Sequence, residues 1–375
     1  MESIKESPME SPKHTLFITG AAGYVGTMLV HQFSKRADVD HMICIDKEPL
    51  PEMIKELVDA SKYTWINANM SDDGWQEKVA AKNPDIVIHT AWQIREMYGD
   101  QKTQWKWNVT GTDMVFDFAF NTPSVKRLIH FSTVASYAAY ADNTIDHFFT
   151  EAEPFRESDY LYAIEKDASE KHLEEKYQLA IEAKRKAGVS DPEKAIPQVA
   201  IIRPAAITGP RGRYTRIRFG LQSALSGQLN KSNLSHRIVS KLVSWVPITP
   251  KWCRQFIHED DITNITEILA FDNYEDRYEA YNACPPGEVV LGKDMASAVG
   301  KKALPVHPWL IRIVFFFAWH LSQGAIPTSR GGWKSYSYPI VVDGSKFSRK
   351  FNYKYFMAPK EAFVKKEGRY MEFVK

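Results

Sequence analysis

The sequence predicts an α/β protein with a doubly wound, Rossmann-type parallel sheet and a smaller C-terminal part that binds substrate. Over residues 16–202, short apolar runs alternate with longer amphipathic stretches, the pattern of parallel strands joined by helices. Several of these runs are apolar throughout, which is typical of central strands that helices cover on both faces. A glycine-rich turn directly follows the first run.

Six runs are expected to form the sheet: Leu16–Thr19, Met42–Asp46, Tyr63–Ile66, Asp85–His89, Leu128–Phe131 and Val199–Ile202. The Lys/Glu-rich stretch from Glu165 to Lys194 predicts a long solvated helix with a loop. We expect a flexible tail over residues 1–14 and a Rossmann domain over 15–208. After Gly209 the alternation is lost, so residues 209–375 are expected to bind mainly substrate, with some strands or helices returning to the first domain.

Composition restricts the class of protein. With 375 residues, 44% hydrophobic and 25% charged, the chain falls in the ordinary globular range, and a largely disordered or collagen-like chain is excluded. A net charge of +2 gives no long-range field for nucleic acid, so no nucleic-acid partner is expected. Cys44, Cys253 and Cys284 have no metal-type spacing, so we expect neither a metal site nor a disulfide framework, and a cytoplasmic location.

The most apolar stretch is Trp309–Leu321. It is too short to span a bilayer, and it contains Arg312 and His320. We expect a buried helix in preference to an interfacial one, while peripheral membrane contact remains an alternative.

The turn after the first strand contains three glycines, each three residues from the next. Such a turn lets the N–H groups at a helix N-terminus approach a pyrophosphate, and it lets the helix pack closely on the sheet. Glycine also serves ordinary turns, so the strand before it and the helical pattern after it carry the assignment. The predicted phosphate-binding residues are Gly20, Ala22, Gly23, Tyr24, Val25 and Gly26.

Asp46 ends the second predicted strand, twenty residues after Gly26. A carboxylate there accepts hydrogen bonds from the adenosine ribose and repels a 2′-phosphate, which favours NAD over NADP. Lys47 weakens this discrimination, and an ordinary strand-end aspartate is the alternative. Both residues are candidate cofactor contacts.

A phenol and an ammonium lie four residues apart in Tyr162 and Lys166, on one face of a predicted helix. An ammonium and a positive nicotinamide ring both favour the phenolate, which would make Tyr162 an acid/base. Ser132 and Thr133 follow the fifth predicted strand, at the sheet edge where doubly wound folds bind ligands. Each feature alone has an ordinary structural explanation, a surface helix pair or a strand-end cap, but together they indicate catalysis.

These motifs resemble the extended short-chain dehydrogenase/reductase family, also known as the NAD-dependent epimerase/dehydratase family, over roughly residues 15–363. The matching segments, in order, are Thr19–Gly26, Asp85–Ala91 (DIVIHTA), Asn108–Thr112 (NVTGT), Val125–Tyr137 (VKRLIHFSTVASY), Tyr162–Lys166, Arg203-Pro204 with Gly209-Pro210, and Arg254–Asp261 (RQFIHEDD).

The resemblance implies that Thr133 is the catalytic hydroxyl, Tyr162 the acid/base and Lys166 the residue that holds the nicotinamide ribose. The further cofactor contacts that it implies are Asn69, Met70, Thr90, Ala91, Asn108, Ser132, Arg203 and Pro204, besides Tyr162 and Lys166 themselves. Asn69 stands where the family often has an aspartate.

Two departures from the family pattern stand out. Ser136-Tyr137-Ala138 replaces Val-Tyr-Gly, which leaves the loop geometry open. Val134-Ala135 replaces the Asp-Glu pair of the dehydratases, which argues against sugar 4,6-dehydration.

Substrate signals are weaker. Arg211, Arg213, Arg216 and Arg218 crowd one segment, and Arg254 matches an arginine that contacts nucleotide-sugar phosphates in some relatives of the family. Guanidinium groups suit phosphates, so Thr133, Arg211 and Arg254 are the predicted substrate contacts, although a solvated basic loop explains the arginine group equally well.

The leading hypothesis is an NAD-dependent epimerase or dehydrogenase of a sugar or nucleotide sugar. The aromatic residues around Trp245 and Trp252, with the apolar run at 309–321, leave open a bulky steroid-like or lipid-like hydroxy or keto compound. A third hypothesis is a dinucleotide-sensing module without turnover. The resemblance also implies a homodimer through helices around Trp105–Phe120 and Tyr162–Glu182, although the aromatic residues of the first could pack internally.

Overall fold

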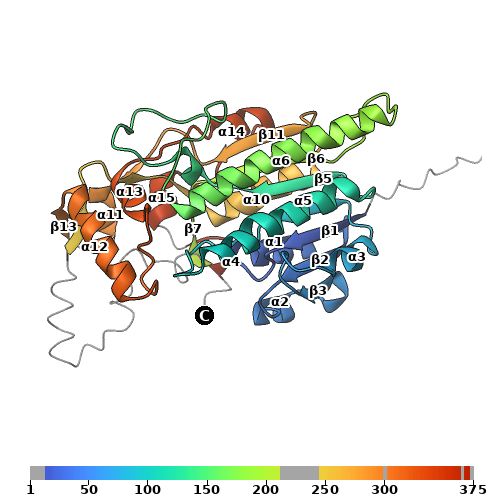
Figure 1. Cartoon of the computed structure of the whole chain (residues 1–375), viewed down its shortest axis with the longest axis horizontal. Helices are drawn as coiled ribbons and strands as arrows, with labels where there is room; N and C mark the ends of the chain where they lie inside the picture. Colours follow the sequence, from blue (N-terminus) through green and yellow to red (C-terminus); the bar gives the residue numbers. More distant parts are fainter. Residues whose placement is uncertain (1–12, 212–244, 299–301, 365–366, 372–375) are drawn as a thin grey trace, which may run out of the picture.

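A parallel sheet of seven strands, in the order β3-β2-β1-β4-β5-β6-β11, forms the centre of the molecule (Figure 1). The structure is a computed structural model that describes residues 13–211, 245–298, 302–364 and 367–371. The strands are β1 (His14–Thr19), β2 (Val39–Asp46), β3 (Tyr63–Asn67), β4 (Ile86–His89), β5 (Arg127–Phe131), β6 (Gln198–Pro204) and β11 (Tyr278–Ala283). The order reverses direction between β1 and β4, and ligands bind at the carboxyl ends of strands at such a point.

The predicted doubly wound sheet and all six predicted strands are confirmed, with ends that differ by a few residues. The predicted tail lies outside the described residues up to residue 12, and His14 already belongs to β1. The sequence did not single out β11, which comes from beyond Gly209 and pairs in parallel with β6. Its sequence, YEAYNA, is too polar to stand out as an apolar run.

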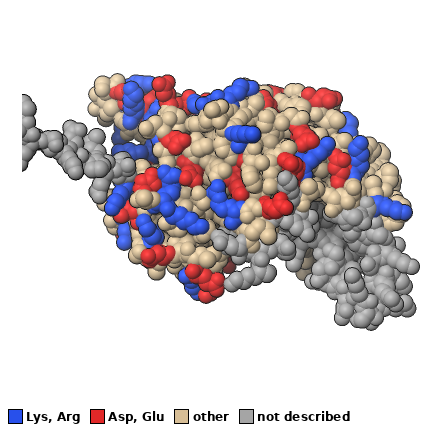
Figure 2. Space-filling model, turned by 180° about the vertical axis from the view of Figure 1, so that it is seen from behind, with Lys and Arg blue, Asp and Glu red and all other residues tan. Residues whose placement is uncertain are grey.

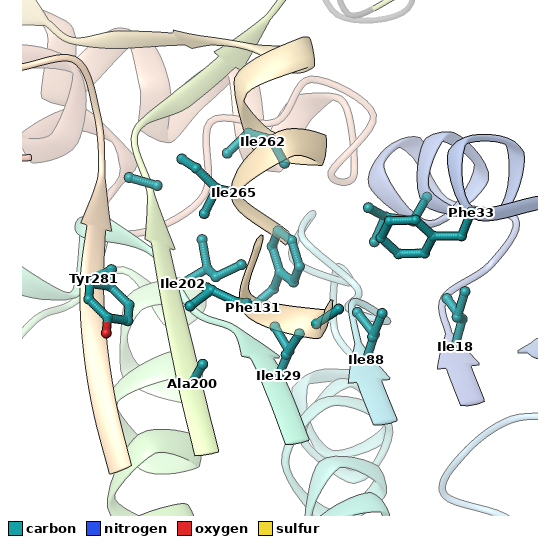
Figure 3. Close-up of a cluster of buried hydrophobic side chains, with 14 of the residues drawn as sticks. Ile18, Phe33, Ile88, Ile129, Phe131, Ala200, Ile202, Ile262, Ile265 and Tyr281 are labelled. Atoms are coloured by element: carbon teal, nitrogen blue, oxygen red, sulfur yellow. The ribbon is translucent and has the colours of Figure 1, made fainter. Parts of the chain in front are cut away.

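Successive residues of each strand point to opposite faces, and each face has its own core. Leu16 and Ile18 face α1 (Tyr24–Ser34), α2 (Glu52–Leu57) and α10 (Glu259–Phe271), whereas Phe17 faces α3 (Trp75–Ala80), α5 (Gly111–Asn121) and α6 (Leu161–Lys186). Figure 3 shows the first core, in which Ile262 and Ile265 of α10 lie over strand residues of the sheet. Burial on both faces explains why the strand sequences are so apolar.

Helix α6 is the long helix that the Lys/Glu-rich stretch predicted, and it ends at Lys186. A buried ion pair joins it to β6: the Arg203 guanidinium donates to the Glu170 carboxylate at 2.6 Å and to the Tyr137 hydroxyl at 2.9 Å. Carboxylate and hydroxyl together raise the pKa of Arg203 against the opposing effect of burial. The pair fixes α6 against the end of the sheet that carries the predicted catalytic residues.

The chain after Gly209 builds a smaller cluster of short elements around Val246, Trp252, Phe256 and Val290. Its strands pair in twos: β9 (Cys253–Arg254) with β12 (Val290–Leu291), and β8 (Trp245–Ile248) with β13 (Lys302–Pro305). A further strand, β10 (Phe256–His258), pairs with β7 (Ala206–Thr208), which comes just before Gly209. The helices are α11 (Gly292–Ala298), α12 (Pro308–Leu321), α13 (Gly332–Ser337) and α15 (Pro359–Val364), while α14 (Ser345–Phe351) packs on β11. The remaining short helices are η1 (Ala60–Lys62), α4 (Gln101–Trp105), η2 (Lys106–Thr110) and η3 (Val134–Tyr137).

The apolar run at 309–321 forms α12, but the prediction that this helix is buried is wrong. Only Ile311 and Trp319 are buried in it, whereas Trp309, Phe316 and Phe317 are each more than half exposed. Burial fails because the elements beside α12 are short and cover one face of it only. In the described part of the chain, no helix combines the length and the apolar character that crossing a bilayer requires.

Ala138, at the position where the family usually has glycine, adopts a left-handed backbone with φ +63° and ψ 144°. A residue with a Cβ is strained there. We expect Ala138→Gly to raise the free energy of unfolding by about 1 kcal/mol, measured by chemical denaturation. The matched control is Ala139→Gly, since that neighbour is equally buried and has no positive φ. Equal losses of stability in both variants would show that Ala138 is not strained.

Asp261 in α10 has a pKa raised to about 6, chiefly because the carboxyl is buried, although Tyr353 and the Phe356 N–H donate to it. The folded state therefore holds a proton between about pH 4 and 6 that the unfolded state has lost, so this carboxyl lowers stability as pH rises through that window. We expect Asp261→Asn to gain stability relative to the unmodified chain over the same interval, by up to about 3 kcal/mol. Urea denaturation at several pH values measures the difference, and a difference independent of pH would contradict the expectation.

Candidate active site

The glycines of the predicted phosphate-binding turn stand where no side chain fits. Gly20 has φ +70°, and a Cβ there would lie 2.5 Å from the backbone of Ala91. A Cβ on Gly26 would lie 2.1 Å from the Gly20 carbonyl oxygen. Gly23 is the N-cap of α1 and supplies no side-chain acceptor for the helix. The turn therefore joins β1 to the N-terminus of α1 at the closest possible approach, which is the geometry that a pyrophosphate needs.

Asp46 lies beside this turn, at the end of β2. Its carboxylate accepts hydrogen bonds from the Ala22 N–H and the Glu48 N–H, both at 2.9 Å. Burial is the largest influence on this carboxyl and raises its pKa, which those two bonds partly offset. Lys47 points elsewhere, with its ammonium 4.5 Å from the centre of the Trp107 ring. Asp46 thus fixes the turn as well as presenting a carboxylate at the crevice.

The predicted adenine contacts follow β3. The Asn69 Oδ1 already accepts from the N–H and the hydroxyl of Ser71, so a base can be contacted by the Nδ2 donor, or by Oδ1 in place of one of these bonds. Met70 is buried, and its carbonyl accepts from the Trp75 indole. On the opposite side of the turn, the Thr90 hydroxyl donates to the Thr19 carbonyl at 2.7 Å, which places Thr90 and Ala91 against Gly20.

Asn108 is fully occupied by protein partners. Its Oδ1 accepts from the Gln93 N–H, and its Nδ2 donates to the Gln93 carbonyl and to Glu165 at 2.7 Å. Glu165 is buried, also accepts from Gln104, and has a pKa raised mainly by burial. Asn108 therefore holds the loop after β4, and sequence reasoning missed Glu165 as its support. The position next to Lys166 was the available signal, but exposed glutamates are the rule on such helices.

Lys166 is buried against the end of β5. Its ammonium donates to the Phe131 carbonyl and lies 3.4 Å from the centre of the Trp92 ring. Burial holds the pKa of Lys166 well below its usual range, although Glu170 and Glu165 act in the opposite direction. Sequence reasoning missed Trp92, the residue after Ala91, because nothing in the sequence places it beside a lysine of α6.

The loop of Thr133 and the first turn of α6 are in contact. Ser136, three residues after Thr133, donates to the Ala163 carbonyl at 3.4 Å, next to the half-buried Tyr162. Lys166 makes a second link one turn later, to the residue before Ser132. The structure thus brings Thr133, Tyr162 and Lys166 to one end of the sheet.

The other predicted cofactor contacts at the ends of β5 and β6 are Ser132, Arg203 and Pro204, and their side chains differ in the partners that they have. The Ser132 N–H donates to the Ile202 carbonyl, and the Ser132 Oγ is buried with no partner in the described part of the chain. The Arg203 guanidinium donates hydrogen bonds to Glu170 and Tyr137, so this side chain faces α6 and has a structural role. Pro204 ends β6 and is half-buried.

The two predicted substrate arginines approach from the C-terminal part. Arg211 donates to the Tyr24 carbonyl at 2.8 Å and lies near the Tyr24 ring. The Tyr24 hydroxyl in turn donates to the buried Glu259, a residue that sequence reasoning missed. Arg254 donates to the carbonyls of Cys253 and Ser335, and burial lowers its pKa. The other arginines of the basic group, Arg213, Arg216 and Arg218, lie outside the described residues.

The comparisons agree with this geometry. The model of the family described as "NAD dependent epimerase/dehydratase family" matches residues 16–284. The enzyme WbmG of Bordetella bronchiseptica, solved with NAD and UDP, is 21% identical over 98% of this chain and 96% of its own, with a TM-score of 0.66. WbmH of the same organism, solved with NAD+, is 18% identical over 96% and 100%, with a TM-score of 0.65.

The UDP-glucose 4-epimerase of Thermotoga maritima, solved with UDP-glucose, is 17% identical over 93% of this chain and 96% of its own, with a TM-score of 0.63. The three solved structures share the fold with this chain, and the family model covers most of its length. The chain therefore belongs to the NAD-dependent epimerase/dehydratase family, a family of enzymes that use NAD.

Proposed function

We propose that the protein is an NAD-dependent oxidoreductase or epimerase that acts on a secondary alcohol or ketone, most directly of a sugar or nucleotide sugar. One observation carries the proposal: the loop of Thr133 and the turn of Tyr162 meet at the carboxyl end of β5, at the same sheet edge as the glycine turn. Hydride chemistry needs a hydroxyl acid/base and a dinucleotide at one place, and this edge offers both.

The residues present fit NAD. The glycine turn is a cradle that any Cβ would fill, and the Asp46 carboxylate stands where a ribose hydroxyl needs an acceptor. We also propose that the other cofactor contacts predicted from the sequence bind NAD. Arg203 and Asn108 are exceptions, because they support the surrounding loops. The bound dinucleotide would accept and return a hydride at the carbon that bears the reacting hydroxyl.

Three side chains would perform the protein's part of the reaction. Thr133 donates a hydrogen bond to the reacting oxygen of the substrate, and Tyr162 moves the proton of that oxygen. Lys166 has three N–H donors, of which the Phe131 carbonyl and the Trp92 ring take two, so one remains for a ribose hydroxyl. A positive charge at Lys166 also favours the phenolate of Tyr162.

The side chains of residues 134 and 135 restrict the class of reaction that we propose. Val134 and Ala135 begin η3 directly after Thr133, and neither supplies the carboxyl group that dehydratases use for β-elimination. Epimerisation and simple oxidation or reduction need only the hydride and the proton. Isomerase activity therefore stays within the proposal, and 4,6-dehydration falls outside it.

A nucleotide-sugar substrate is favoured by Arg211, which contacts Tyr24 at the start of α1, and by Arg254, because guanidinium groups suit phosphates. Relatives of the same fold were solved with UDP and UDP-glucose. The exposed apolar helix α12 favours the second candidate, a bulky apolar alcohol or ketone. The chain is incubated with NAD and either a panel of nucleotide sugars or a panel of bulky apolar alcohols. Net accumulation of NADH with only one of the two panels decides between the two candidate substrates. Conversion between stereoisomers without release of NADH identifies an epimerase.

The proposal extends to assembly and location. Helices α5 and α6 lie side by side on one face of the sheet (Figure 1), and α6 exposes 68% of Leu179 there. We propose that they form a homodimer in the cytoplasm. Sedimentation of the unmodified chain and of Leu179→Glu tests the dimer, since a charge at this exposed apolar position of α6 would release monomers.

We expect Tyr162→Phe to lower kcat by about a hundredfold or more while the Kd for NAD stays unchanged, because only the proton transfer is lost. Thr133→Val should lower kcat in the same direction. Tyr177→Phe is the matched control, since it removes a phenol from the same helix at a buried position away from the sheet edge. Unchanged turnover in Tyr162→Phe would remove this residue from the mechanism, with NAD binding showing that the fold is intact.

We expect Asp46→Asn to weaken NAD about tenfold and to narrow the preference over NADP, because the ribose loses a charged acceptor and a 2′-phosphate is no longer repelled. Since burial raises the pKa of Asp46, NAD affinity of the unmodified chain should fall as the pH is lowered toward that pKa. Fluorescence titration with both dinucleotides measures this. Asp40→Asn, at an exposed position on the same strand, should leave both affinities unaltered; an equal effect there would indicate a general loss of charge.

A further inference from the structure

The feature of the molecule that the leading candidate, a nucleotide-sugar substrate, leaves unused is the outer face of α12. Its exposed apolar residues are Trp309, Leu310, Ile313, Val314, Phe316, Phe317 and Leu321. At 100° per residue they occupy one side of the helix, about 160° wide, which also contains the exposed His320. The opposite side holds Ile311, Phe315 and Trp319, which face the protein. The helix is thus apolar on both sides, and only one side is covered.

Exposure of this apolar face to water is unfavourable, and an exposed apolar patch of this kind marks an interaction surface. Two of its most exposed residues, Phe316 and Phe317, have 57% and 56% of their surface in solvent, and Leu321 has 82%. Another apolar pair, Trp245 and Leu304, is exposed on the paired strands β8 and β13, of which β13 immediately precedes the helix in the chain. Large aromatic and aliphatic residues are the ones that enter the acyl boundary of a bilayer.

The charges around the helix indicate which partner fits. From residue 295 to residue 342 the sequence contains no aspartate or glutamate, but it contains Lys301, Lys302, Arg312, Arg330 and Lys334. Lys302 and Arg312 are exposed, and each lies over a tryptophan, Trp245 and Trp333. Elsewhere both signs are interspersed, as Figure 2 shows for the rear of the molecule. Lys334 pairs with Asp159, whereas the exposed Lys302 and Arg312 flank the apolar face. An apolar face flanked by exposed cations complements an anionic lipid surface.

We propose that α12 is the docking surface of this protein for an anionic phospholipid bilayer, which it enters from one side without crossing. The helix has 14 residues and lies flat in the interface, with the side chains of Phe316 and Phe317 among the acyl chains and Lys302 and Arg312 at the headgroups. A neutral protein partner would not be favoured by the absence of acidic residues from residues 295–342. A second copy of the chain would bring the same positive charges together, and they would repel one another.

The docked face also lies close to the crevice. Tyr98, in the segment after β4, packs edge-on against Trp319 at 5.5 Å between ring centres, and its hydroxyl contacts His320 at 3.2 Å. On the other side, α12 packs on α13, and Gly331 before α13 touches the backbone of Asp159 and Tyr160, just ahead of Tyr162. A bilayer bound at α12 therefore lies beside the segment after β4 and near the residues that precede Tyr162. The docking does not depend on which reaction occurs there.

Flotation of the full chain with vesicles tests the proposal without any activity measurement. We expect the chain to float with vesicles of phosphatidylcholine mixed with phosphatidylglycerol, to remain behind with phosphatidylcholine alone, and to dissociate at high salt. Phe316→Glu with Phe317→Glu should weaken binding by more than about tenfold, and Lys302→Glu with Arg312→Glu by about tenfold. The matched control is Leu57→Glu with Ile145→Glu, two comparably exposed apolar residues on other elements, which should bind vesicles as the unmodified chain does.

NAD affinity and the thermal transition of each variant show that it is folded. The proposal is overturned if the unmodified chain floats with neither vesicle, or if it floats equally with both and salt has no effect. It is also overturned if Phe316→Glu with Phe317→Glu floats as well as the control pair. Loss of a dimer in that variant, without vesicle binding, would identify a second copy as the occupant. Loss of stability alone would identify another part of this chain.

Discussion

The arrangement of this site depends on one buried cation, the ammonium of Lys166. A charge removed from water is costly unless donors and acceptors replace the solvent. Here the Phe131 carbonyl and the face of Trp92 replace it, with Glu165 and Glu170 as the nearest opposite charges. These contacts connect α6 to the carboxyl end of β5. Because Tyr162 lies one turn before the lysine and Thr133 two residues after Phe131, the same interaction brings the two proposed catalytic hydroxyl groups to one edge of the sheet.

Around this lysine, polar side chains form two separate hydrogen-bonded groups, which we call layers. Glu165 holds Asn108, which holds the loop after β4, while Glu170 holds Arg203 and through it Tyr137. Both glutamates belong to α6, so a single helix positions the loops that surround the crevice. Substitutions in these layers would act on the proposed reaction through geometry, since neither glutamate is placed to reach a substrate.

The sequence was sufficient for the parts of the fold that rest on local pattern. Apolar runs located β1 to β6, and glycine spacing located the turn whose backbone approach excludes any Cβ. It was insufficient where contacts join distant segments. Trp92 gave no signal because its partner, Lys166, lies far away in the chain. Glu259 belongs to the matched segment Arg254–Asp261, but its contact with the distant Tyr24 could not be predicted. The polar strand β11 and the exposed face of α12 were also missed, since hydrophobicity alone does not say which residues a neighbour will cover.

The seventh strand has a consequence for how the chain reaches this state. β11 covers the edge of β6, but it is synthesised seventy residues and more after β6 ends, behind the whole segment 209–277. Until residue 283 has left the ribosome, the nascent sheet has an open edge of unpaired backbone groups, and such edges recruit other chains. The two parts of this protein are consequently one cooperative unit in biogenesis, and truncation near residue 208 would produce an aggregating fragment in place of a separate nucleotide-binding domain.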